Sequence, residues 1–228
     1  MTKILDHGYL RVVETWGRGD TVGEAEAGII EAARQSTQGS FRGWETDEKL
    51  LRYLYEHHHD SPFEFAGMTV EVQAPIFVFR EWHRHRTQSY NEMSARYAEL
   101  PDLFYVPSLE RLVKGKQSTA NKQSSAVGFN RADIEDIQRI ISNSNYLQRG
   151  LYERLLNKGL ARELARLVIP INQYSRMRAT ANLRNWLAFL TLRMAPEAQW
   201  EIRQYANALA DEVKTHFPRT YTLFKERV

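Results

Sequence analysis

Residues 67–82 read GMTVEVQAPIFVFREW, and this stretch decides what kind of fold the chain can form. Val, Ile and Phe dominate it, and Met68, Val70 and Val72 alternate with polar residues, which is the period of a strand with one buried face. The Ala74-Pro75 pair interrupts the run, because proline cannot donate to a sheet ladder. We therefore predict one or two strands within this stretch.

Apolar residues at three- and four-residue spacing predict helices on both sides of these strands. Residues 172–182 alternate bulky and polar side chains weakly, which predicts a further strand. Gly159 ends the longest helical pattern, since glycine readily adopts the conformation that terminates a helix. Helices are expected at 22–36, 50–59, 134–157, 161–169, 182–194 and 196–217, the last with Pro196 near its first turn.

The chain has 228 residues, which favours a single elaborated domain spanning 1–228 over two full domains. Residues 114–130 are rich in Ser, Gln, Asn and Lys and offer little apolar surface to bury. We therefore expect a flexible solvent loop there, within the domain and not at a boundary between domains.

Composition excludes several classes of protein. Hydrophobic residues make up 43% and charged residues 26%, so a disordered or fibrous chain is excluded and a soluble globular protein is expected. The net charge of +3 is too small to predict a nucleic-acid polymer as partner, but it suits a smaller anionic ligand such as a phosphorylated metabolite. The absence of cysteine excludes disulfides, thiolate metal sites and thiol nucleophiles. No signal peptide or membrane span is recognisable, so we expect a cytoplasmic protein with no membrane partner.

The most polar stretch, residues 84–97, follows the predicted strands directly. A solvated helix face is the structural alternative, but the stretch has no apolar stripe that would anchor a helix. Planar guanidinium groups suit phosphate, and hydroxyl and amide groups can bind a ring edge. We predict that the segment binds an anionic, ring-bearing ligand through Arg84, Arg86, Ser89, Asn91, Ser94 and Arg96.

Histidines and arginines elsewhere give weaker signals. In the run His57-His58-His59, successive helical residues point about 100° apart, so three in a row cannot converge on one metal ion, and we predict no metal site. His59 begins a turn that could contact a ligand. Arg166 stands in an apolar run, where a charge usually has a partner. Arg184 and Arg193 lie on different sides of one predicted helix, so that helix could contact two parts of a site.

The spacing of Arg84-His85-Arg86 and Ser94 resembles the RHR-x7-S signature of the flavin-dependent thymidylate synthases. The resemblance continues in family order over roughly residues 50 to 207. Its further elements are His59-x-Ser61-Pro62-Phe63-Glu64, Arg80-x-Trp82, Ser89-Tyr90-Asn91-Glu92, Arg96-Tyr97, Ala165-Arg166-x-Val168-x-Pro170, Asn182-x-Arg184, Phe189-Leu190-x-Leu192-Arg193 and Gln199-Trp200-Glu201-Ile202.

This resemblance implies conversion of dUMP to dTMP, with methylenetetrahydrofolate as carbon donor, NADPH as reductant of FAD, and reduced FAD as hydride donor. It implies an α+β fold with a mixed, mainly antiparallel sheet flanked by helices, and a homotetramer whose active sites are shared between chains. It also implies a reaction without a covalent enzyme nucleophile. The absence of cysteine agrees, since the unrelated class of thymidylate synthase uses a cysteine to attack the uracil ring.

The resemblance also assigns roles to individual positions. Arg193 is implied as the catalytic residue that favours the ionised uracil. Two positions depart from the family pattern: Glu81, where relatives often carry glutamine, and Ala188, where they often carry an amide or imidazole. The implied FAD-binding positions are His59, Ser61, Arg84, His85, Arg86, Glu92, Asn182, Arg184 and Ala188. The implied dUMP-binding positions are Glu81, Trp82, His83, Arg84, Glu92, Met93, Ser94, Ala95, Arg96, Arg166 and Arg193.

Two alternatives remain from other classes of protein. A flavin reductase without methyl transfer would keep the FAD contacts but would not need Arg166 and Arg193. A nucleotide-binding or nucleic-acid-binding protein without catalysis would not bind a flavin that NADPH reduces. Yellow protein bleached by NADPH excludes the binding protein, and release of tritium from labelled dUMP distinguishes the synthase from the reductase.

Overall fold

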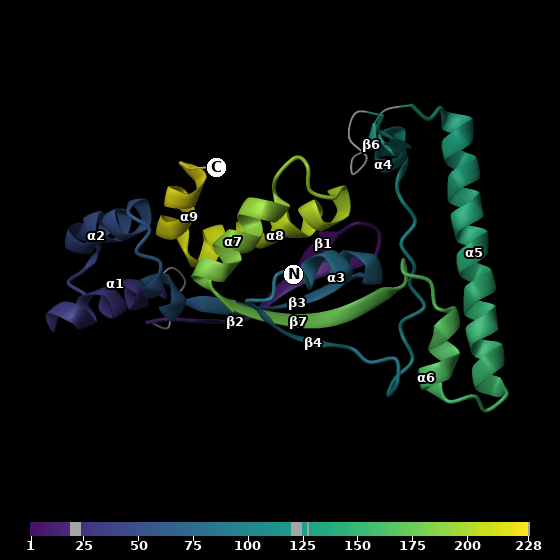
Figure 1. Cartoon of the computed structure of the whole chain (residues 1–228), viewed down its shortest axis with the longest axis horizontal. Coiled ribbons are helices and arrows are strands. Elements are labelled where there is room, and N and C mark those ends of the chain that lie inside the picture. Colours follow the sequence, from purple (N-terminus) through teal and green to yellow (C-terminus); the bar gives the residue numbers. More distant parts are fainter. Residues whose placement is uncertain (19–23, 120–124, 127, 228) are drawn as a thin grey trace.

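The computed structural model describes residues 1–18, 24–119, 125–126 and 128–227. Its centre is a five-stranded sheet in the order β1-β2-β3-β7-β4 (Figure 1), and each of the pairings described in it is antiparallel. The expected class, helices with a mainly antiparallel sheet, is confirmed. The strands are β1 (Thr2–Ile4), β2 (Gly8–Trp16), β3 (Gly67–Pro75), β4 (Ser89–Glu92) and β7 (Tyr174–Asn182).

The two N-terminal strands were missed by the sequence analysis. β1 has only three residues, too few for a recognisable alternation. In β2 the register against β3 shifts between Val12 and Glu14, which breaks the two-residue period along the strand. The central pair is the part that the sequence marks best, because β3 and β7 pair along nine residues each.

The prediction of strand over the whole of 67–82 is wrong in its second half. β3 ends at Pro75, which is the N-cap of helix α3 (Ile76–Trp82). Val78, Phe79 and Trp82 lie at the spacing of one helix face and are buried together. Burial of that face therefore outweighs the strand propensity of Val, Ile and Phe here.

Other helix boundaries also differ from expectation. The last predicted helix, 196–217, corresponds to α8, and Pro218 opens a further helix, α9, that the sequence analysis did not predict, because proline fits the first turn of a helix. Pro196 lies before α8, which begins at Trp200. Residues 22 and 23 of the first predicted helix lie outside the described residues. The remaining elements are α1 (Ala27–Arg34), η1 (Gln35–Thr37), α2 (Trp44–Glu56), η2 (Ser61–Phe65), α4 (Leu109–Val113), α5 (Arg131–Asn157), α6 (Arg162–Ala165), η3 (Arg166–Val168), α7 (Leu183–Arg193), α8 (Trp200–His216) and α9 (Pro218–Lys225).

Helices α3, α7 and α8 cover one face of the sheet (Figure 1), and the main core lies between them and the sheet and extends to α1, α2 and α9. Trp82, Trp186 and Phe189 are fully buried there, with ring centroids 4.7 Å apart for Trp82 and Phe189 and 6.0 Å apart for Trp186 and Phe189. Burial of each such side chain is worth about 1.5–3 kcal/mol. The opposite face is polar: Arg11 Nε donates to Glu71 Oε1 at 2.9 Å. We call the sheet with α3, α7 and α8 the body.

Helices α4, α5 and α6 form an arm at one end of the body (Figure 1). Asn130 begins α5 with a capping box that includes Asp133. The arm is joined to the body through buried Glu201, which accepts from Arg111 Nε at 2.7 Å. Asn172 Nδ2 also donates to Asn145 Oδ1 at 2.9 Å. No residue of the arm belongs to the main core cluster, so polar contacts contribute much of the connection.

The predicted loop at 114–130 carries two short paired strands, β5 (Lys116–Gln117) and β6 (Ser125–Ala126). Residues 120–124 and 127 of this loop lie outside the described residues. Among the helices of the described residues, none combines the length and the apolar character that crossing a membrane requires.

Candidate active site

The polar segment 84–97 is a turn followed by β4 and a second turn, and it is not a helix. β4 pairs with β7, with Ser89 opposite Thr180 and Glu92 opposite Met177. The Tyr90 hydroxyl donates to the carbonyl oxygens of Trp82, at 3.2 Å, and of His85. Burial raises the pKa of Tyr90 to about 12, so this hydroxyl remains a donor. These contacts hold the turn with Arg84, His85 and Arg86 against the end of α3.

A pocket of about 370 Å³ lies beyond the Glu92 end of β4. It brings together predicted nucleotide-binding residues from two distant parts of the sequence, one before and one after the long helix α5. Its walls are largely apolar with a few polar groups, which is typical of small-molecule sites. The lining residues are Ile76, Glu92, Met93, Ser94, Ala95, Leu100, Arg166, Ile169, Ile171 and Ser175.

The cationic side chains near this pocket meet at Glu163 of α6. Arg96 Nε lies 3.5 Å from Glu163 Oε2, and Arg166 Nε donates to the Glu163 carbonyl at 3.3 Å. The partner expected for Arg166 is thus a backbone carbonyl, and within the described residues it has no ion pair. Ser94 Oγ accepts from the Arg96 backbone N–H at 3.3 Å, which leaves the hydroxyl proton free to donate. Together these groups can bind an anion.

Arg193, at the end of α7, lies between α3 and the turn that contains Arg84, His85 and Arg86. Its Nη1 donates to Glu81 Oε2 at 2.9 Å, its Nη2 to the Glu81 carbonyl at 2.8 Å, and its Nε to His85 Nε2 at 2.8 Å. Burial and the adjacent Arg193 charge lower the pKa of His85 to about 4, against the opposing effect of the Glu81 carboxylate. His85 is therefore neutral at physiological pH.

Several of the predicted FAD-binding residues gather at the other end of β4, whereas Glu92, which was also predicted to bind FAD, lines the nucleotide pocket. Arg84 and Arg86 are exposed, and within the described residues neither forms an ion pair, so both charges are available to a diphosphate. Asn185 Nδ2 donates to the Thr87 carbonyl at 3.1 Å, which ties this turn to the start of α7.

Three further FAD-binding candidates surround the same helix start. Asn182 caps α7 by accepting from the Asn185 backbone N–H at 3.0 Å. Arg184 Nη1 donates to Glu64 Oε1 at 2.6 Å, which brings α7 to η2, the 3-10 helix that begins with Ser61. This group and the nucleotide pocket lie at opposite ends of β4, whose four residues span about 13 Å.

Four predicted positions stand apart from these groups. The Trp82 side chain is fully buried and donates to Gln88 Oε1 at 3.0 Å, so it faces the core and not the pocket. His83 is half-buried, with Nε2 3.1 Å from Met177 Sδ. His59 is exposed beside Tyr53, and Ala188 is exposed on α7.

Ser175 was missed by the sequence analysis. It lines the nucleotide pocket from β7, it is only 1% exposed, and its hydroxyl has no hydrogen-bond partner among the described residues. Buried hydroxyls are normally hydrogen-bonded, so this one is a candidate ligand contact. The alternation of residues 172–182 could place it on the core side, but nothing in the spacing marks it as a binding residue.

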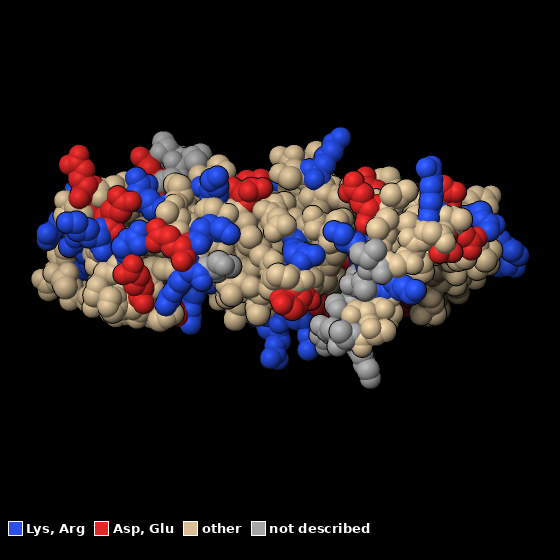
Figure 2. All heavy atoms as spheres, turned by 90° about the horizontal axis from the view of Figure 1, so that it is seen from above, with Lys and Arg blue, Asp and Glu red and all other residues tan. Residues whose placement is uncertain are grey.

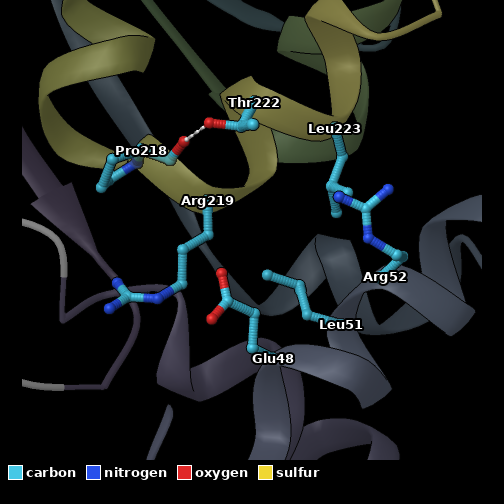
Figure 3. Close-up of a pocket in the computed structure, with 7 residues that line it drawn as sticks. All are labelled: Glu48, Leu51, Arg52, Pro218, Arg219, Thr222 and Leu223. Atoms are coloured by element: carbon cyan, nitrogen blue, oxygen red, sulfur yellow. Dashed lines mark hydrogen bonds between the residues drawn. The ribbon is translucent and has the colours of Figure 1, made fainter. Parts of the chain in front are cut away.

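A second cavity, of about 290 Å³, lies between α2 and α9 (Figure 3). Its arginines are neutralised by neighbours: Arg52 pairs with Glu226 at 2.6 Å and Arg219 with buried Glu26 at 3.8 Å. None of the predicted site residues lines it. On the face seen in Figure 2, basic and acidic side chains are interleaved, and no broad basic surface of the kind that binds nucleic acid is visible there.

Comparison with known proteins identifies the family. The family model for thymidylate synthase complementing protein, Thy1, matches residues 19–219. The chain belongs to the Thy1 family. The matched range contains both ends of the candidate active site, from Ser61 to Arg193.

Relatives in this family carry the name that the signature implied. The flavin-dependent thymidylate synthase of Thermus thermophilus is 42% identical over 225 residues, which is 99% of this chain and 78% of that protein. The enzyme of the same name from Wolbachia pipientis is 40% identical over 224 residues, 98% of this chain and 76% of that protein. The crystal structure of a UMP/dUMP methylase, PolB from Streptomyces cacaoi, bound with 5-Br dUMP is similar with a TM-score of 0.85 and 32% identity. It covers 98% of this chain and 97% of that one.

Proposed function

We propose that this chain is a cytoplasmic flavin-dependent thymidylate synthase that methylates dUMP to dTMP. The observation that carries the proposal is the pocket in which Ser94 and Ala95, from the turn after β4, lie together with Arg166. The names of the relatives and the dUMP analogue bound by the similar methylase support the same substrate.

The nucleotide phosphate would bind at the cationic end of this pocket. Arg96 and Arg166 each have guanidinium N–H groups that are not used in these contacts, and the Ser94 hydroxyl is still able to donate a hydrogen bond. Hydrogen bonds from such groups to a phosphate oxygen are worth about 1.5–3 kcal/mol each. The uracil ring would lie against the apolar wall, near Met93 and Ile169.

Arg193 does not line this pocket, so it would favour the ionised uracil of a nucleotide held by another chain, by providing positive charge next to the ring. A charge held in place beside the atoms where negative charge develops stabilises the transition state by about 3–4 kcal/mol, or a factor of about 10²–10³ in rate. Because Arg193 is held by Glu81 and His85, little reorganisation is needed when charge develops on the ring.

The residues also fit FAD. Arg84 and Arg86 supply charges not neutralised within the described chain, and Ser61, Asn182 and Arg184 surround the start of α7. FAD reduced by NADPH would supply the hydride, and methylenetetrahydrofolate the carbon. The Ala188 departure removes one side-chain hydrogen bond toward the flavin, and Glu81 replaces an amide by a carboxylate near the nucleotide.

Assembly as a homotetramer with shared active sites belongs to the same proposal. The FAD-binding group and the nucleotide pocket lie at opposite ends of β4, so another chain could complete each half. The arm supports assembly, because α5 exposes Ile140 and Leu147 on the side opposite buried Asn145. A stable monomer in sedimentation that holds stoichiometric FAD would contradict shared sites.

The direct test combines flavin spectroscopy with tritium release. We expect purified protein to be yellow, to be bleached by NADPH, and to release tritium from [5-³H]dUMP only when methylenetetrahydrofolate is present. NADPH oxidation without tritium release would identify a flavin reductase. Colourless protein that binds dUMP would identify a nucleotide-binding protein.

A further inference from the structure

Glu81, Arg193 and His85 form a chain of contacts whose effect on the His85 ring the proposed reaction does not explain. Glu81 binds both terminal nitrogens of Arg193, through its carboxylate at 2.9 Å and its carbonyl at 2.8 Å. The remaining nitrogen, Nε, points to His85 Nε2 at 2.8 Å. The Arg193 side chain is only 16% exposed, so water competes little for these contacts.

The chemistry of guanidinium determines which nitrogen of His85 carries its proton. Arginine stays protonated in proteins and has five N–H donors and no acceptor. A histidine nitrogen that faces an arginine N–H at 2.8 Å must therefore be the acceptor. Nε2 is unprotonated in this arrangement, so the ring is neutral and its proton is on Nδ1.

We propose that Glu81 acts through Arg193 as a positioning residue and fixes His85 as the neutral Nδ1–H tautomer. His85 then presents a hydrogen-bond donor on Nδ1 and cannot act as a base at Nε2 while Arg193 is in place. We assign the flavin as the acceptor for this Nδ1–H, and that assignment rests on the proposed function. The tautomer itself does not rest on it.

The groups packed around His85 agree with this assignment. The charged groups that face the ring are Arg193 from α7 and Glu81 from α3. Phe189 packs edge-on against the ring, with centroids 4.8 Å apart, and the Tyr90 hydroxyl donates to the His85 carbonyl. Burial and the Arg193 charge lower the pKa of His85 to about 4 and outweigh Glu81, so the neutral ring persists through the physiological range.

His83 provides an internal reference two residues earlier in the same segment. Its Nε2 lies 3.1 Å from Met177 Sδ, and a thioether sulfur only accepts hydrogen bonds. A neutral His83 therefore carries its proton on Nε2, the opposite of His85. One polypeptide turn would thus hold two histidines in opposite tautomers, each determined by a single neighbour.

The tautomers can be measured by solid-state NMR of flavin-bound protein labelled with ¹³C and ¹⁵N in histidine only. The chain has seven histidines, and the spectrum of His85→Gln assigns the signals of His85 by their disappearance. His83→Gln assigns the reference residue. We expect the ring carbons of His85 to report the Nδ1–H tautomer at pH 7 and to remain unchanged down to pH 5. A doubly protonated or Nε2–H ring for His85 at pH 7 would overturn the proposal.

Variants separate Arg193 from Glu81. In Arg193→Met we expect His85 to lose its fixed tautomer and to titrate about 1 pH unit or more higher, since the positive neighbour is gone. Glu81→Ala is expected to give a mixture of tautomers, whereas Glu81→Gln keeps an oxygen acceptor for Arg193 and the wild-type tautomer. Leu192→Ala, an exposed position beside Arg193, is the matched control and should change nothing.

The readout stays separate from the proposed function. An unchanged His85 spectrum in Arg193→Met, or a wild-type tautomer in Glu81→Ala, would contradict the positioning roles even if the enzyme makes dTMP. Conversely, if tritium release fails but the Nδ1–H tautomer is found, the proposed function is wrong and the proton assignment remains. The wild-type spectrum alone tests the tautomer if the Arg193 variant does not fold.

Discussion

Helices α7 and α5 differ in how much of their surface is buried within the chain. The shorter α7 has 11 residues and buries Leu183, Trp186, Leu187, Phe189 and Leu190, while α5 has 27 residues and buries only Ile134, Asn145 and Tyr152. α7 packs on the sheet of the body, whereas α5 stands at the end of the molecule beside α4 and α6 (Figure 1). The body therefore completes a core within one chain, but the arm does not. This difference supports the proposal that the outer side of the arm packs against another chain.

The largest expected effect is in the body core. Phe189→Ala removes a fully buried ring that packs against Trp82 and His85, and we expect a loss of about 3–5 kcal/mol in the free energy of unfolding. Urea denaturation measures this loss. Leu147→Ala, at a 59% exposed position of α5, is the matched control and should cost less than about 0.5 kcal/mol in a dilute, unassembled sample. If both variants lose the same free energy of unfolding in that sample, the difference between body and arm is contradicted.

The second prediction concerns the outer side of the arm. Replacing both Ile140 and Leu147 by Ser should weaken assembly, because each apolar side chain buried against another chain is worth about 1.5–3 kcal/mol. Sedimentation over a range of protein concentrations should show smaller species than wild type, with the helical content of the chain retained. Ser142→Ala, on another side of α5, should assemble normally. If the double variant assembles like wild type, Ile140 and Leu147 do not hold the chains together and the proposed role of the outer side is wrong.

The third prediction concerns the nucleotide pocket, where body and arm meet. Ser94→Ala should raise the KM for dUMP by roughly tens-fold and leave kcat nearly unchanged, because a hydrogen bond to a phosphate oxygen is worth about 1.5–3 kcal/mol. Steady-state assays at saturating folate and NADPH measure both constants. Ser142→Ala, at an exposed position of α5 outside the pocket lining, is the control. A Ser94→Ala protein that binds dUMP normally yet makes no dTMP would point instead to a nucleophilic serine.

The smallest expected effect is a pH dependence of the free energy of unfolding, caused by the Arg11–Glu71 pair on the polar face of the sheet. The hydrogen bond from Arg11 is the main cause that lowers the pKa of Glu71 below its usual value. A lowered carboxyl pKa stabilises the folded chain above the unfolded-state pKa of about 4.3, and this stabilisation is lost as pH falls through the lower folded-state value. We expect Glu71→Gln to reduce stability at pH 7 by about 1 kcal/mol and to flatten its decrease in acid.

The corresponding pair in the arm serves as the control for this pH dependence. Arg131 and Glu135 of α5 lie 2.9 Å apart, but their side chains are 83% and 61% exposed. An exposed pair of this kind contributes little, so Glu135→Gln should leave the stability between pH 3 and pH 7 unchanged. Chemical denaturation at each pH measures both variants. A larger acid effect for Glu135→Gln than for Glu71→Gln would reverse the comparison.

The sequence alone determined the features that local patterns specify. Alternation identified β3 and β7, helical spacing identified α5 and α7, and the RHR-x7-S spacing identified the family that the comparisons then showed. These signals are local because neighbours along one element share its period and its buried face. The roles of the individual site residues stay predictions, although the nucleotide pocket brings five of those positions together.

Tertiary structure decided what local signals leave open. Residues 76–82 have strand-forming composition, yet they form α3 because a helix buries Val78, Phe79 and Trp82 against the body. The same packing turns Trp82 away from the pocket, brings Arg193 of α7 between Glu81 and His85, and leaves the Ser175 hydroxyl at the pocket without a partner among the described residues. These contacts join residues far apart in the chain. They depend on how completed elements pack, which no short window of sequence contains.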